Sequence, residues 1–225
     1  MSIVGPEPPP IVLWPMLAEH HDDIVQLVVQ TFFRDEPLNR CLAFDIPTEP
    51  MEFTELILSL AAHDQCSFVA IDSSTEKIIG VILNVIKHRR PLADREHQEK
   101  LDRNEFQSEK LSYILNVLKQ LHHRTDLFDE MKTDRLLHVV IVAVDPHYRG
   151  LRLTEKLIRA SLDRAKNELD VQGAFSEATS LYSSKAFRKQ GFHICEEVIY
   201  ANYDHIRLAS LTGDHDRCQL LAKVL

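Results

Sequence analysis

The stretch Val142-Ala-Val-Asp-Pro-His-Tyr-Arg-Gly-Leu-Arg-Leu-Thr-Glu-Lys-Leu-Ile158 decides the fold. It continues an apolar strand that is predicted over 136–144 and that ends at Pro146, because proline has no amide to offer a sheet. A helix is predicted beyond the turn, since apolar residues recur there at helical intervals. The turn itself carries Arg149 and Gly150.

A strand-to-helix turn of this kind can hold a phosphate group. The first amides of a helix have no acceptor within the helix and lie at the positive end of its dipole. The diphosphate of a nucleotide-like cofactor could therefore bind here, although the same residues could form an ordinary connection. Neither GxGxxG nor GxxxxGKS/T occurs in the chain. The strand is nearly all aliphatic, which predicts burial on both of its faces.

Two motifs resemble the GNAT superfamily of N-acetyltransferases. Its acetyl-coenzyme A signature has Gln or Arg, two variable residues, Gly, one variable residue and a final Gly or Ala. The similar run here is Arg149-Gly150-Leu151-Arg152-Leu153-Thr154, in which Arg152 replaces a glycine and Thr154 the final small residue. Residues 174–192 resemble the next strand and helix, with Phe187 where a tyrosine often serves as general acid.

A third motif narrows the resemblance to one branch. Phe32-Phe-Arg-Asp-Glu-Pro-Leu-Asn39 is similar to the F-x-x-D-E-P-L motif of insect arylalkylamine N-acetyltransferases. The serine-rich run 179–184, the end of the chain at 215–225 and residues 200–203, which we expect in a closing strand, are also similar to that branch. The likeness follows nearly the whole chain in order.

The resemblance implies an acetyl-coenzyme A-dependent N-acetyltransferase of the EC 2.3.1 class. It would acetylate the primary amine of a small arylalkylamine by direct attack in a ternary complex. Val142, Ala143 and Val144 would bind the pantetheine arm between two splayed strands, and residues 149–154 would bind the diphosphate. Polyamines, other aliphatic amines and protein amines are alternative acceptors. The departures from the motifs leave open a second alternative, an inactive acyl-coenzyme A-binding module.

The chemistry of amine acetylation needs two proton-handling groups. An amine is protonated at pH 7 and needs a general base before it can attack a thioester. The resemblance gives this role to Glu36, and the like charge of Asp35 would raise its proton affinity. For the leaving thiolate we expect help from Ser183, with Ser180 and Thr179 as the other candidates. Ser180 could instead cap the following helix.

Histidine and cysteine spacing gives no metal motif. The pairs His20-His21 and His122-His123 are adjacent, so neither pair can face one site from a helix, and no HExxH or CxxC occurs. We expect His138, inside the apolar strand, to be a core residue. The sequence therefore predicts no metal, and it predicts four reduced thiols, Cys41, Cys66, Cys195 and Cys218.

Composition indicates one soluble domain of 225 residues, 44% of them hydrophobic. The 26 basic and 34 acidic residues give a net charge of −8, which disfavours nucleic acid and favours a cationic substrate. No apolar run approaches the ~18 residues of a membrane span, and the chain does not begin like a secretory signal. We expect a cytoplasmic monomer without nucleic-acid or membrane partners.

Alternating strand and helix patterns predict an α/β fold with a mixed, mostly antiparallel sheet flanked by helices. We expect a disordered tail over 1–10 and one domain over 11–225. A helical insertion at about 87–134 would shape the amine pocket in the resemblance. Strands are expected at 11–17, 67–72, 78–86, 136–144, 192–203 and 218–224, and helices at 20–33, 50–62 and 104–123.

Overall fold

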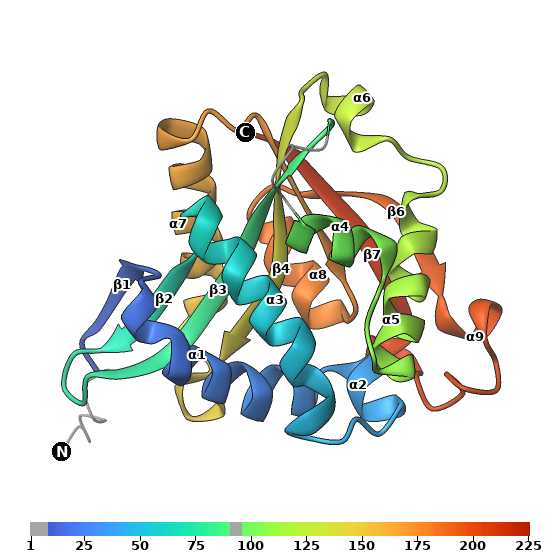
Figure 1. The fold of residues 1–225 in the computed structure, drawn as a ribbon, viewed down its shortest axis with the longest axis horizontal. Helices are drawn as coiled ribbons and strands as arrows, with labels where there is room; N and C mark the ends of the chain where they lie inside the picture. Colours follow the sequence, from blue (N-terminus) through green and yellow to red (C-terminus); the bar gives the residue numbers. More distant parts are fainter. Residues whose placement is uncertain (1–8, 91–95) are drawn as a thin grey trace, which may run out of the picture.

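The computed structural model describes residues 9–90 and 96–225, so most of the tail expected over 1–10 lies outside the described residues. One seven-stranded sheet has the order β1-β2-β3-β4-β5-β7-β6 (Figure 1). In the described sheet β4 and β5 are parallel and the other neighbours antiparallel, which confirms the predicted mixed sheet. The strands are β1 Ile11–Pro15, β2 Phe68–Asp72, β3 Lys77–His88, β4 Arg135–Val144, β5 Gly173–Ala178, β6 His193–Ile199 and β7 Arg217–Val224.

Helices cover both faces of the sheet (Figure 1). On one face, α1 (His21–Leu27) and α3 (Thr48–Asp64) share a core with β3, and on the other α7 (Leu153–Glu168) and α8 (Leu181–Lys189) do so. A π-helical turn, Val28–Phe33, leads from α1 toward α2 (Pro37–Cys41). The remaining α-helices of the described residues are α4 Glu96–Arg103, α5 Glu109–Lys119, α6 Leu127–Met131 and α9 Tyr200–Tyr203. In the described ranges, no helix combines the length and apolar character needed to cross a bilayer.

The central strands β4 and β5 part soon after they meet. They pair over Leu136–His138 and Gly173–Phe175 and no further. The register of β4 against β3 slips between Leu83 and Asn84, which leaves Val140 as the extra residue of a β-bulge. A bulge bends its strand and shifts which face each side chain occupies. The expected splaying of two central strands therefore has a physical cause.

The bulge also corrects the expectation that this strand is buried on both faces. Val140, Val142 and Val144 are only half-buried, whereas Ile141 and Ala143 are buried in the core beneath α1 and α3. Half-burial at alternate positions means that part of β4 lines open space instead of core.

Two expected elements differ from the observed ones. The helix predicted over 104–123 begins at Glu109, because Ser108 caps it and Asn104 has a left-handed backbone with φ of 57°. Residues 200–203, expected in a strand, form the short helix α9. The last two strands, both expected from the sequence, pair with each other in antiparallel fashion as β6 and β7.

Candidate active site

A cavity of about 810 Å³ lies where β4 and β5 diverge. Residues of both strands line it, together with the segment around Glu36, the start of α8 and the helices between β3 and β4. Six of the ten phenylalanines of the chain lie in its wall: Phe32, Phe33, Phe53, Phe128, Phe175 and Phe187. The modest aromatic content of the sequence is therefore concentrated in one place.

Glu36 is buried in this wall and is the N-cap residue of α2. Its Oε2 accepts a hydrogen bond from the amide of Asn39 at 2.7 Å, and its Oε1 has no hydrogen-bond partner in the described structure. Burial raises the pKa of the Glu36 carboxyl, and the nearby Thr179 hydroxyl and the α2 amides only partly offset that effect. A buried carboxylate with a raised pKa and an unpartnered oxygen suits a general base.

Asp35 does not have the role expected for it. Its carboxylate is partly exposed and pairs with Arg149, with 2.7 Å between Oδ2 and Nη2. The raised pKa of Glu36 therefore comes from burial and not from a like charge at Asp35. The pair also joins the segment that carries Glu36 to the turn expected to bind the cofactor.

The three candidate hydroxyl groups occupy different places. Thr179 and Ser183 line the cavity together with Glu36, and Ser180 is not among the lining residues. The Ser180 Oγ accepts a hydrogen bond from the Ser183 amide at 3.3 Å, and the Ser183 Oγ donates to the Ser180 carbonyl at 2.9 Å. Ser180 thus caps α8, one of the two readings that the sequence allowed.

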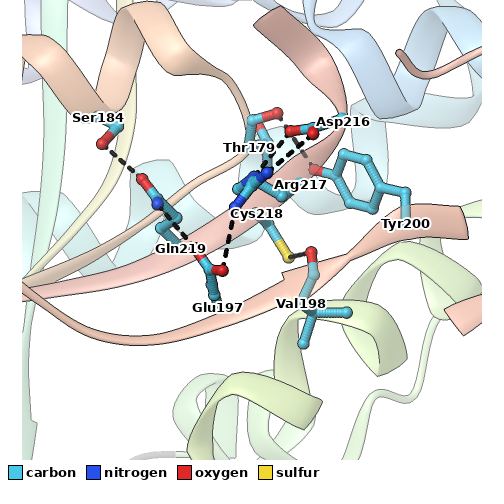
Figure 2. A network of polar contacts seen from close by, with 9 residues as sticks. All are labelled: Thr179, Ser184, Glu197, Val198, Tyr200, Asp216, Arg217, Cys218 and Gln219. Carbon is cyan, nitrogen blue, oxygen red and sulfur yellow. Dashed lines mark hydrogen bonds and ion pairs between the residues drawn. The ribbon is translucent and has the colours of Figure 1, made fainter. Parts of the chain in front are cut away.

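Tyr200 does not line the cavity but contacts Thr179, which does, and the sequence did not predict this role. Figure 2 shows it beside Thr179, to whose carbonyl oxygen the phenol donates a hydrogen bond of 3.1 Å. Tyr200 is fully buried, and burial raises its pKa far above the usual range, so the phenol stays a neutral donor. Its contact fixes the end of β5, where Thr179 meets Glu36.

The cavity wall also holds a cluster of Glu177, His122 and His138 that the sequence did not predict. The Nε2 atoms of His122 and His138 donate to the two carboxylate oxygens of Glu177, at 2.7 and 2.6 Å. Burial opposes ionisation of Glu177, yet the charges and hydrogen bonds of His138 and His122 hold its pKa well below the usual range. His138 stacks on Phe175 with ring centroids 4.3 Å apart. It is therefore a cavity residue, not the plain core residue we expected.

The turn after β4 places the expected cofactor-binding residues at one end of that strand. A 3-10 turn, Pro146–Tyr148, comes first, and α7 begins only at Leu153. Gly150 has φ of +84° with open space around it. Arg152, which we expected in helical conformation, is left-handed with φ of 58°, a geometry that costs a non-glycine residue about 1 kcal/mol. Glycine at this position in the GNAT signature avoids that cost.

The surroundings of the turn suit a diphosphate and a pantetheine arm. The first three amides of α7, those of Leu153, Thr154 and Glu155, have no acceptor within the helix. The side chains of Arg149 and Arg152 are exposed beside them. Because β5 pairs with β4 only as far as His138, the edge of β4 at Val142–Val144 that faces β5 has no strand partner in the described sheet.

Comparisons with known proteins agree with this geometry. No protein-family model matches the sequence, and neither does any curated protein sequence. Arylalkylamine N-acetyltransferase 2 from Aedes aegypti is 29% identical with a TM-score of 0.83, over 95% of this chain and 98% of that one. The chain has the GNAT fold.

Two further solved structures share the GNAT fold with this chain. The Drosophila melanogaster polyamine N-acetyltransferase, which forms N-acetylagmatine, is 20% identical with a TM-score of 0.78, over 96% of this chain and all of that one (100%). Arabidopsis thaliana NAA60 in complex with acetyl-CoA is 16% identical with a TM-score of 0.55, over 96% and 100% of the two chains. At these identities the likeness concerns the fold alone.

Proposed function

We propose that this protein is an acetyl-coenzyme A-dependent N-acetyltransferase whose acceptor is the primary amine of a small arylalkylamine. The fold shared with N-acetyltransferases supports the class of reaction. The main support for an active site here is the buried Glu36 carboxyl, which lies in the wall of the cavity between the splayed strands. Its pKa is raised and its Oε1 has no hydrogen-bond partner among the described residues. Four free thiols fit a reducing compartment, and we propose a monomer in the cytoplasm.

The residues divide the proton chemistry between them. Glu36 takes a proton from the bound ammonium group through water, and the freed lone pair attacks the thioester carbonyl. The tetrahedral intermediate expels the thiolate, to which Ser183 donates a hydrogen bond. Over the whole reaction the nitrogen loses two protons, of which one ends on the thiol and the other leaves to water. The transfer is direct and needs no metal.

The cavity favours an aromatic monoamine over a polyamine. Six phenylalanine rings provide an apolar wall for an aryl group. A polyamine would need a second carboxylate for its second cation, but both oxygens of Glu177 are taken by His122 and His138. The other two lining carboxylates also have partners, since Asp102 pairs with Lys87 and the Asp126 Oδ1 accepts the amides that begin α6. The net charge of −8 favours the polyamine alternative, because a polyamine carries more than one positive charge.

Thiol release with a panel of amines tests the proposal. The panel pairs phenylethylamine and its ring-substituted forms with agmatine, spermidine and a lysine peptide, each with acetyl-coenzyme A. We expect release of coenzyme A thiol, with kcat/KM at least about tenfold higher for the aryl amines. A preference for agmatine or spermidine would overturn the acceptor class. Thermal stabilisation by coenzyme A without thiol release from any amine would instead indicate a binding module.

A further inference from the structure

Three side chains of metal-binding type, one from α6 and two from the edge strand β6, meet outside the cavity. Figure 1 shows where these two elements stand in the fold. Glu130 belongs to α6, and His193 and Cys195 belong to β6. One ligand atom of each lies within 4.8 Å of the other two, and 3.8 Å separates the His193 Nε2 from the Glu130 Oε1. Metal bonds of about 2.0–2.3 Å place two ligands of a tetrahedral zinc about 3.3–3.8 Å apart. Small side-chain rotations would therefore complete such a site.

The backbone of β6 brings the thiol and the imidazole together. The register of β6 against β7 slips between Ile194 and Glu196, which makes Cys195 the extra residue of a β-bulge. Bulges re-aim side chains at sheet edges. Linear spacing could not reveal this group, because Glu130 is far from the other two ligands in the sequence.

The donor set selects the kind of ion. A thiolate, an imidazole and a carboxylate together suit Zn²⁺, and soft thiolate disfavours Mg²⁺ and Ca²⁺. We propose that Glu130, His193 and Cys195 bind one Zn²⁺, with a water molecule in the fourth position. This proposal revises the expectation of no metal and assigns the ion no part in acetyl transfer. A bound ion would tie α6, which contributes Leu127 and Phe128 to the cavity wall, to the edge of the sheet.

Binding is coupled to loss of a proton. Cysteine binds a metal ion as the thiolate and not as the thiol. Zn²⁺ displaces that proton, forms the Zn–S bond and releases one H⁺ to solvent. Apparent affinity should therefore rise with pH.

Titration of the metal-free full chain with Co²⁺ tests the site, because a cobalt–thiolate bond absorbs in the near ultraviolet. We expect one saturable Co²⁺ per chain with this absorption, displacement by Zn²⁺, and a higher Tm with Zn²⁺. Cys195→Ser should abolish the absorption, and His193→Asn should weaken Zn²⁺ binding by at least about tenfold. Cys41→Ser, at another partly exposed thiol, is the matched control and should behave as the unaltered chain.

Two results would overturn the site. One is thiolate absorption that persists in Cys195→Ser, which would place the metal at another cysteine. The other is failure of the unaltered chain to bind Zn²⁺ at micromolar concentration. The Tm of each variant without metal shows whether it is folded, so loss of binding is distinguishable from loss of structure.

Discussion

The Glu36 carboxyl combines deep burial with one unpartnered oxygen atom. Burial disfavours the charged form, so its pKa is raised, and ionisation of this group weakens the folded state as the pH rises through that pKa. The same property makes the carboxylate a stronger proton acceptor once it is ionised. Burial of Glu36 therefore makes the carboxylate a stronger base and, once it is ionised, lowers the stability of the folded state.

The substitution Glu36→Gln tests both effects. Turnover at neutral pH should fall by about 10²-fold or more, because the amide cannot accept the ammonium proton. The acid limb of the pH–rate profile, which reports a carboxyl whose pKa lies above the 4.5 of an ordinary glutamate, should disappear. The free energy of unfolding at pH 7 should not decrease, because a neutral side chain can still cap α2. Asp35→Asn, a change at the adjacent exposed carboxylate, should keep the acid limb; its loss there would argue against Glu36 as the base.

A second pair of variants distinguishes the role of Ser183 from that of Ser180. Ser183→Ala should lower kcat by about 10- to 100-fold, with the largest loss for amines whose chemistry limits the rate. Ser180→Ala should cost about 1 kcal/mol of stability through loss of the α8 cap and leave kcat nearly unchanged. Steady-state rates and urea unfolding of both proteins distinguish the roles. Equal loss of kcat in the two variants would mean that the capping geometry, and not the Ser183 hydroxyl, matters.

At the scale of elements, irregular backbone positions the site. A π-helical turn precedes the residue that carries the proposed base, a bulge at Val140 opens the wedge, and a left-handed Arg152 starts α7. Such irregularities are common at functional sites. None of them follows from hydrophobic periodicity, which locates regular strands and helices well but carries no signal for one extra residue in a strand.

Gly150 and Gly213 allow a controlled test of the cofactor turn. Both have positive φ, +84° and +61°, and an added Cβ would meet nothing within 4 Å at either. Gly150→Ala and Gly213→Ala should therefore each cost about 1–2 kcal/mol of stability from backbone strain. Only Gly150→Ala should also raise KM for acetyl-coenzyme A, since its methyl group would crowd a bound diphosphate. An unchanged KM would remove the turn from the cofactor site.

The His122–Glu177–His138 group joins the insertion to the central strands. Because the pKa of Glu177 is lowered, its stabilisation is fully present above the unfolded pKa near 4.5 and is lost as the pH falls toward the folded value. Glu177→Gln should cost about 1.5–3 kcal/mol at pH 7, since the His122 and His138 imidazoles lose a charged hydrogen-bond acceptor. Glu168→Gln, in an exposed pair with Arg164, should cost less than about 1 kcal/mol.

Urea unfolding at several pH values measures both variants. The loss of unfolding free energy in Glu177→Gln, relative to the unaltered chain, should become smaller below pH 4.5. The loss in Glu168→Gln should stay small at every pH. If the loss of unfolding free energy in Glu177→Gln does not depend on pH, then packing and not charge stabilises the contact of Glu177 with the two histidines.

At the scale of the whole molecule, the cavity exists because distant segments meet. Glu36 approaches Thr179 and Tyr200 from segments that are separated by most of the chain. Motif resemblance singled out Glu36, Ser183 and the turn at 149–154 as candidates, and apolar patterning predicted the last two strands. The Glu177 group, the gathering of phenylalanines and the support from Tyr200 depend on tertiary contacts, so no local pattern could predict them.

Direct acetyl transfer from acetyl-coenzyme A to an amine in this cavity is tested most directly by one mass measurement. The full chain is mixed with acetyl-coenzyme A, first alone and then with phenylethylamine, and protein, amine and thiol are quantified. We expect unchanged protein mass without amine, and after its addition equal amounts of N-acetyl amine and free coenzyme A. An acetylated protein that passes its acetyl group to the amine, or no acetyl amine at all, would contradict direct transfer.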